Sequence, residues 1–212
     1  QNQGSSFSAS YQGDGTSGAY IWGAQLNAGS VAKPYFPTTD RLNIPQIDYT
    51  DGYSSILIEP QRTNLLTYSN DFSTFNNSQY WILNNEISPD GTMNASTLTF
   101  TGANQYTNKS TSIGVGVICS SSVYVKGNLN ETIIFNCGGV DKVHTLTGNW
   151  QRLKTENKTS VNSTVAFSTY GGVSGRQFLV YGVQIEQGSY ATSYIPTVAS
   201  TVTRNATTVS KT

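Results

Sequence analysis

One segment near the C-terminus reads Phe178-Leu179-Val180-Tyr181-Gly182-Val183-Gln184-Ile185-Glu186. Its β-branched and aromatic residues predict a strand, and Gly188 just beyond it predicts a turn. Because side chains alternate between the two faces of a strand, we expect one apolar and one polar face. The expected faces are Tyr181, Val183 and Ile185 on one side, and Gly182, Gln184 and Glu186 on the other.

The pattern around this strand occurs a second time near the N-terminus. Residues 11–38 align without gaps with residues 170–197 and are identical at 10 of 28 positions. Residue frequencies of roughly 7% would give about two identities by chance. In the second copy the identical residues are Tyr170, Gly172, Gly182, Gln184, Gly188, Ser189, Ala191, Tyr194, Pro196 and Thr197. Since the two copies lie 159 positions apart, we expect one complete domain between equivalent strands.

The repeat predicts four parts of the chain. They are the C-terminal part of a preceding module (1–38), a connector (39–66), a complete β-sandwich (67–198) and a C-terminal tail (199–212). In the connector, Thr50-Asp51-Gly52 lies between two short extended runs and predicts a β-hairpin. In the sandwich, strand-like runs alternate with turn residues at the spacing of antiparallel sheets. These runs include residues 80–83, 96–101, 115–126, 131–136, 150–155, 164–170 and 178–186.

The composition agrees with an all-β protein and excludes several partners. Ser, Thr and Asn supply 72 of 212 residues, which favours strands and turns over helices. Only 11% of residues are charged, and twelve basic residues balance twelve acidic ones. This balance offers no electrostatic surface for a nucleic acid or an anionic membrane, so we expect neither as a partner.

A longer motif string resembles a known family. Leu57-Ile58-Glu59-Pro60-Gln61-Arg62-Thr63-Asn64-Leu65-Leu66 and the residues up to Ser73 are similar to the start of repeated modules in bacteriophage tail-fibre and head-fibre proteins. Further matching segments follow in order at residues 88–92, 122–127, 149–153, 181–190, 193–197 and 202–206. Those modules resemble the jelly rolls of carbohydrate-binding modules. The resemblance implies an antiparallel jelly-roll β-sandwich, preceded by the terminal strands of a second similar module.

The resemblance also implies a role. We expect a structural virion protein of a bacteriophage, a fibre or a head or tail appendage, that displays a jelly roll and contributes to host attachment. Its expected place is the virion outside the cell, and its expected partners are other copies of itself and other virion proteins. The alternative is a carbohydrate-binding module for a host cell-surface glycan; an accessory domain of a glycan depolymerase is a weaker alternative.

The chain shows no recognisable catalytic constellation. Its carboxylates are scattered rather than paired, and the one histidine, His144, lies in a strand-like run where a structural role is expected. Two cysteines are too few for a structural zinc site. We therefore expect a protein that is not an enzyme, with no catalytic residues, no metal ligands and no cofactor.

Alternation along three strands predicts one polar and aromatic surface. Tyr124 and Lys126 should face away from the core, because Val123 and Val125 alternate with them. By the same reasoning the outer face should include Tyr170, Gln184 and Glu186. Such a face could bind a carbohydrate or a neighbouring subunit, and the sequence leaves both open.

Cys119 and Cys137 flank a predicted hairpin centred near Asn128. An antiparallel pairing about that centre would place the two cysteines opposite each other, where a disulfide can form. The alternative is a pair of buried free thiols in a protein made in a reducing cytosol. Both states are open at this point, the free thiols being favoured.

Overall fold

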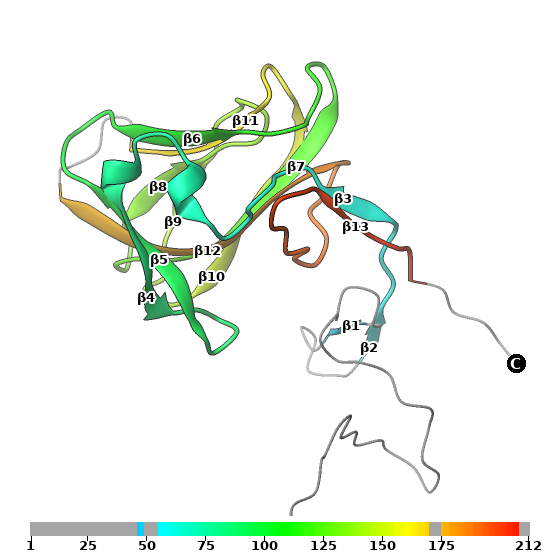
Figure 1. Cartoon of the computed structure of the whole chain (residues 1–212), viewed down its shortest axis with the longest axis horizontal. Coiled ribbons are helices and arrows are strands. Elements are labelled where there is room, and N and C mark those ends of the chain that lie inside the picture. Colours follow the sequence, from blue (N-terminus) through cyan, green and yellow to red (C-terminus); the bar gives the residue numbers. More distant parts are fainter. Residues whose placement is uncertain (1–45, 49–54, 170–174, 208–212) are drawn as a thin grey trace, which may run out of the picture. The chain divides into compact units, whose positions relative to one another are not determined.

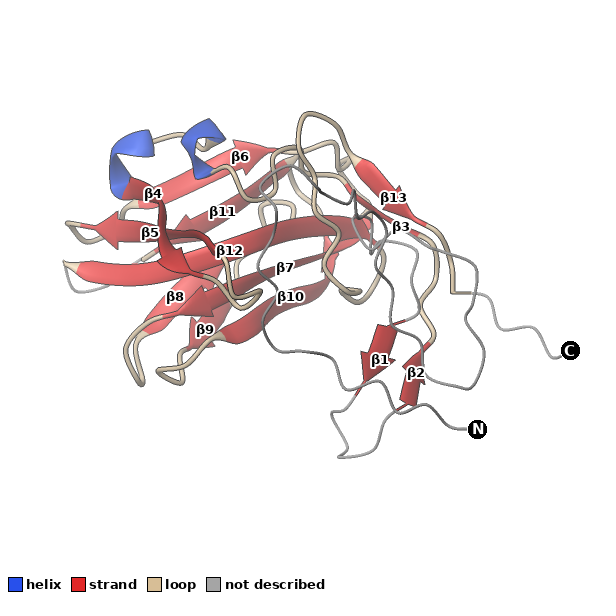
Figure 2. Cartoon of the chain, turned by 60° about the horizontal axis from the view of Figure 1, so that its bottom comes forward, coloured by secondary structure: helices blue, strands red, loops and turns tan. Residues whose placement is uncertain are grey.

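The computed structural model describes residues 46–48, 55–169 and 175–207. The predicted partial module at 1–38 and Tyr170 lie outside the described residues. The described elements belong to one compact unit, residues 42–212. Two antiparallel sheets lie face to face in it, as Figures 1 and 2 show, and the prediction of an all-β jelly-roll sandwich is confirmed.

The larger sheet consists, in spatial order, of β10 (Gln151–Thr159), β7 (Ile118–Lys126), β12 (Arg176–Gln187), β5 (Met93–Phe100) and β4 (Trp81–Ile87). The smaller sheet consists of β6 (Tyr106–Ser110), β11 (Thr164–Ser168), β8 (Thr132–Phe135) and β9 (Val143–Thr145). Two short 3-10 helices, η1 (Phe72–Thr74) and η2 (Ser78–Tyr80), precede β4. The strands β6 and β9 are short and mostly polar.

Two ribbons accompany the sandwich. β1 (Gln46–Asp48) pairs antiparallel with β2 (Ser55–Leu57), which confirms the hairpin predicted in the connector. β3 (Arg62–Asn64) pairs antiparallel with β13 (Val202–Arg204), so the expected C-terminal tail contains a strand. This second ribbon returns the chain, after one complete sandwich, to the point where it entered.

The core fills the space between the two sheets. At one end, the rings of Phe72 and Trp81 stack with centroids 4.4 Å apart, and Phe167 of β11 contacts Trp81 edge-on at 5.8 Å. At the centre, Val123 and Val125 of β7 are fully buried, as their alternation with Tyr124 predicts. Burial of side chains of this size contributes about 1.5–3 kcal/mol each.

The predicted faces of β12 are wrong at Tyr181. Val183 and Ile185 are fully buried, whereas Tyr181 lies directly opposite Tyr124 on the outer face. A β-bulge between Tyr181 and Gln184 causes the difference, with Gly182 at a φ of +65°. Because a bulge inserts one extra residue into a strand, the alternation of faces changes at that point.

We expect Gly182→Ala to lower the free energy of unfolding by about 1–3 kcal/mol. A Cβ atom at this position would lie 3.1 Å from the Tyr194 ring, in addition to the cost of the positive φ. Gly91→Ala is the matched control, because Gly91 has a φ of +83° and nothing within 4 Å of an added Cβ. Urea unfolding measures both; equal losses would show that the contact with Tyr194 is unimportant.

The predicted hairpin between Cys119 and Cys137 is also wrong. Cys119 lies in β7 of the larger sheet, and Cys137 follows β8 of the smaller sheet. The chain between them therefore crosses from one layer of the sandwich to the other. The two cysteines are nevertheless neighbours, because both side chains point into the core.

Candidate functional site

The outer face of the larger sheet carries the described residues that the sequence singled out. Tyr124 and Lys126 lie on β7 and are partly exposed. Gln184 and Glu186 lie opposite Ser122 and Ser120 of β7, on the same outer face as Tyr124. The expected grouping of these four residues on one face is therefore present; whether they bind a ligand stays a prediction.

Gln184 and Glu186 are fully buried, although the sequence predicts them on an open face. A segment of residues 189–197, here called the cover segment, lies over them. Ile195 donates its backbone N–H to Gln184 Oε1 at 2.6 Å, and Thr192 donates its N–H to Glu186 Oε2 at 2.9 Å. The hydroxyl of Thr192 also bonds to Glu186. Both side chains thus hold the cover segment in place.

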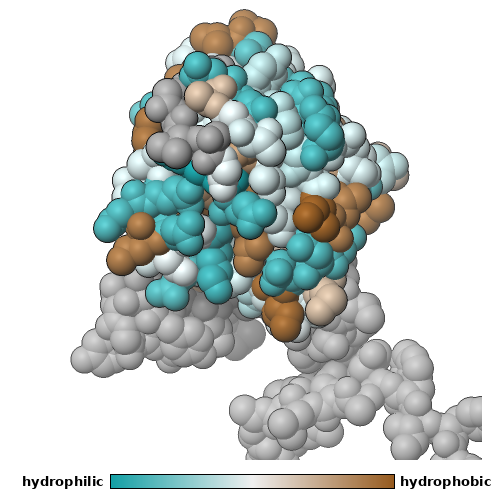
Figure 3. Space-filling view, turned by 90° about the vertical axis from the view of Figure 1, so that its left-hand side faces the viewer, coloured by the Kyte–Doolittle hydropathy of each residue, from teal (hydrophilic) through white to brown (hydrophobic). Residues whose placement is uncertain are grey.

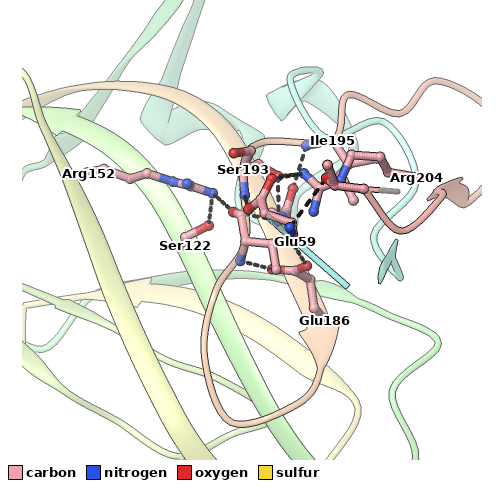
Figure 4. Close-up of polar contacts among 10 residues, drawn as sticks. Glu59, Ser122, Arg152, Glu186, Ser193, Ile195 and Arg204 are labelled. Carbon is pink, nitrogen blue, oxygen red and sulfur yellow. Dashed lines mark hydrogen bonds and ion pairs between the residues drawn. The ribbon is translucent and has the colours of Figure 1, made fainter. Parts of the chain in front are cut away.

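A buried ion pair fixes the same segment from the other side. Arg204 Nη1 lies 2.9 Å from Glu59 Oε2, and both side chains are almost completely buried. The backbone N–H of Ser193 donates to Glu59 Oε1 at 2.7 Å, and Arg204 also donates to the carbonyl of Ser193. Arg152, which lies in β10, donates to the carbonyl of Thr192. Figure 4 shows Arg152 pointing towards the segment that contains Ser193. The cover segment is therefore bonded to several parts of the chain.

These contacts assign structural roles to several residues that the two copies of the internal repeat share. Gly182 makes room for the Tyr194 ring, and Gln184 accepts from the backbone of the cover segment. Thr197 donates its hydroxyl to the carbonyl of Leu66 at 2.6 Å. Residues shared by the two copies thus include those that close the sandwich. Their N-terminal counterparts lie outside the described residues.

Tyr194 of the cover segment lies in a row with two tyrosines of the larger sheet, Tyr181 and Tyr124. The ring centroids of Tyr124 and Tyr181 are 5.9 Å apart, and those of Tyr181 and Tyr194 are 5.6 Å apart. The Arg152 guanidinium lies 5.4 Å from the Tyr124 centroid. With Asp90, these four residues form a surface that we call the tyrosine face. Sequence reasoning missed Tyr181, and Gly182 within the strand was the available signal of a bulge.

Asp90 supplies the negative charge of the tyrosine face. The Tyr181 hydroxyl donates to Asp90 Oδ2 at 2.9 Å. Burial opposes ionisation of Asp90, but hydrogen bonds from Thr92, Asn94 and Ser88 outweigh it and hold the pKa of this carboxyl well below its usual range. Burial and the bond to Asp90 raise the pKa of Tyr181, and burial raises the pKa of Tyr194 to about 12. At neutral pH the face therefore presents a carboxylate beside protonated phenols.

The tyrosine face combines aromatic rings with charged side chains. Aromatic rings provide flat apolar contacts, while a carboxylate, a guanidinium and amides offer hydrogen bonds. His144 lies away from it, 8% exposed, with its Nε2 3.0 Å from Thr155 Oγ1. Among residues 46–48, 55–169 and 175–207, no group of three metal-binding side chains comes together. The same residues contain no helix long and apolar enough to span a membrane.

A concave region lies beside β3 and the end of β12. A cavity of about 530 Å³ is lined by Gln61, Arg62, Thr63, Leu65, Gln187 and Gly188. The guanidinium of Arg62 lies 5.3 Å from the ring centroid of Tyr190, which is 47% exposed. Tyr190 is therefore an exposed ring next to Arg62, which lines this cavity, and it serves as a comparison for the tyrosine face.

Exposed apolar side chains occur at the far edge of the larger sheet. Ile82, Ile87 and Met93 are each more than half exposed. Figure 3, which views the molecule from the side of β4 and β5, shows hydrophobic side chains separated by hydrophilic ones on that face. Dispersed apolar residues of this kind are ordinary for a protein surface.

No family model matches the sequence, and no curated protein matches it. Among solved structures, the chain is similar to TmCBM61 in complex with β-1,4-galactotriose, at 13% identity over 59% of this chain and 99% of that chain, with a TM-score of 0.41. It is also similar to the CBM22-1 xylan-binding domain of Paenibacillus barcinonensis Xyn10C, at 16% identity over 60% and 96% of the two chains, with a TM-score of 0.38. A third similar structure contains the CBM22-1 and GH10 modules of Clostridium thermocellum xylanase 10B (16% identity, 65% of this chain, 30% of that chain, TM-score 0.40). These likenesses are too distant to indicate what this chain binds, and none of the three is a phage fibre protein.

Proposed function

We propose that this domain is a non-catalytic carbohydrate-binding module and that a glycan lies along the tyrosine face. The observation that carries the proposal is the pairing of Tyr124 and Tyr181, whose ring centroids are 5.9 Å apart on the outer face of a rigid sheet. Both rings are partly exposed. Aromatic rings on preformed surfaces provide contact area for a ligand without loss of side-chain entropy on binding.

Charged groups beside the rings supply the directional contacts that a sugar needs. Arg152 and Lys126 carry positively charged hydrogen-bond donors, and the exposed carboxylate of Asp90 adds a negative charge. Charged and polar groups next to an apolar platform match the hydroxyls and C–H faces of a pyranose. This arrangement favours a neutral polysaccharide over a purely apolar ligand.

The test is binding to a panel of immobilised polysaccharides and host cell-wall glycans, followed by titration with the best ligand. We expect Tyr124→Ala and Tyr181→Ala each to weaken binding by about tenfold or more, because truncation of a central aromatic contact costs more than about 1 kcal/mol. Tyr181→Phe keeps the ring and removes the donor to Asp90, so we expect a smaller loss.

Tyr190→Ala is the matched control, because this tyrosine is exposed but lies next to Arg62 rather than on the tyrosine face. We expect its affinity to equal that of the unmodified chain. Loss of binding in Tyr190→Ala with full binding in Tyr124→Ala would place the ligand at the cavity that Arg62 lines instead. Absence of binding to every glycan would overturn the proposal, and release of reducing ends would overturn its non-catalytic part.

A second candidate role is that of a building block in a phage fibre or head appendage, located in the virion. It is favoured by the motif order over residues 57–206 and by the repeat of the closing segment at 11–38. Self-association measured by light scattering and detection of the chain in purified particles test this role. A monomer absent from particles would exclude it and leave the glycan-binding proposal untouched.

A further inference from the structure

We propose that Cys119 and Cys137 form an intramolecular disulfide that joins the two sheets of the sandwich. Their Sγ atoms lie 2.7 Å apart, although the residues are 18 positions apart in the chain. Nonbonded sulfur atoms normally keep a separation of about 3.6 Å, so this pair lies well inside ordinary contact. A disulfide bond measures about 2.05 Å, so a small movement closes it.

The backbones on both sides are held by hydrogen-bonded structure. Cys119 pairs with Lys158 of β10 on one side and with Gln187 of β12 on the other. Cys137 exchanges both backbone hydrogen bonds with Val140, each 3.0 Å long. Gly138 between them has a φ of +55°, and a Cβ atom there would lie 3.2 Å from Cys119 Sγ. The same Cβ atom would lie only 2.5 Å from Ser160 Cβ, so the glycine lets the chain after Cys137 pack closely against both Ser160 and Cys119.

The surroundings favour an intramolecular bond over any other fate of these thiols. Both cysteines are fully buried in the core, and the sequence contains no third cysteine. A buried thiol is inaccessible to a partner protein in the folded state. The bond would cross-link β7 to the chain after β8, two segments that belong to different sheets.

The chemistry balances with glutathione disulfide as the oxidant. The Cys119 thiolate attacks one sulfur of glutathione disulfide, which forms a mixed disulfide and releases one glutathione thiolate. Cys137 then loses its proton and attacks Cys119 Sγ, which releases the second glutathione. The same balance holds if Cys137 attacks first. Because both sulfurs are buried, the exchange takes place before the core closes during folding.

The test is refolding of the full chain from denaturant in a buffer of reduced and oxidised glutathione. After excess glutathione is removed, thiols are counted in denaturant and the intact mass is measured. We expect no titratable thiol, a mass about 2 Da below that of the reduced chain, and a Tm higher by roughly 6–12 °C. Two free thiols in the refolded monomer, or a mixed disulfide with glutathione, would overturn the proposal.

Two variants separate the bond from other effects of the buffer. Cys119→Ala/Cys137→Ala should have the same Tm after reducing and oxidising refolding, although its core is less well packed. Cys137→Ala retains one thiol, and its Tm should likewise be the same after reducing and oxidising refolding. A redox-dependent Tm in the double variant would assign the stabilisation to something other than this disulfide. Glycan binding is not involved in either measurement, so this proposal and the proposed function fail independently.

Discussion

Arg204→Met should lower the free energy of unfolding by about 3–5 kcal/mol, the usual cost of leaving one partner of a buried ion pair alone. The guanidinium lies 2.9 Å from Glu59 Oε2, and the two side chains are only 6% and 7% exposed. Without it, Glu59 keeps a buried negative charge with the N–H of Ser193 as its remaining side-chain partner. Guanidinium chloride unfolding at pH 7 measures the loss.

The same chain provides a matched control. Arg176 lies 3.7 Å from Glu131 in a more exposed ion pair, so we expect Arg176→Met to cost about 1 kcal/mol or less. The double variant Glu59→Gln/Arg204→Met should be more stable than Arg204→Met alone, because it removes the unpaired charge. Equal losses in the two arginine variants would contradict the importance of burial at the Glu59–Arg204 pair.

Acid should destabilise the sandwich through His144 by up to about 3 kcal/mol between pH 6.5 and pH 4. Burial, with a further contribution from the nearby Lys142 charge, lowers the pKa of His144 to about 4 in the folded protein. In the unfolded chain the histidine titrates near pH 6.5, so the unfolded state binds more protons in this range. The contribution of neutral His144 to the free energy of unfolding is therefore fully present above pH 6.5 and is lost as the pH is lowered towards 4.

His144→Gln isolates this contribution from that of the carboxylates. Glutamine cannot gain a proton and can still bond to the hydroxyl of Thr155, which lies 3.0 Å from the imidazole in the unmodified chain. The unfolding free energies of both proteins, measured from pH 4 to pH 8, should converge or cross as the pH falls. Parallel pH profiles would show that His144 titrates normally in the folded state.

The strands were predictable because their signal is local. Alternation of Val123 and Val125 with Tyr124 identified both the strand and its buried face, and β-rich runs bounded by glycine marked most of the larger sheet. Shorter strands were harder: β6 has only five residues, Tyr106–Ser110, with a lysine among them. Such a segment becomes a strand because its backbone pairs with β11, which local composition does not encode.

The candidate site was only partly predictable. Tyr124 was expected on the outer face and lies there, but Tyr181 was assigned to the wrong side, because one extra residue at Gly182 reverses the alternation. Gln184 was assigned to the correct side but not recognised as buried. Its burial depends on Ile195 and the rest of the cover segment, which folds back over the sheet.

Alternation and turn residues were enough to establish an antiparallel β-sandwich with a hairpin before it, because these signals arise from neighbouring residues. Three features required the tertiary structure: the tyrosine face, the cover segment held by Glu59 and Arg204, and the contact of Cys119 with Cys137. Each brings together side chains from strands that are distant in the sequence. Their positions depend on sheet order, bulges and packing, which are properties of the assembled layers rather than of any single segment.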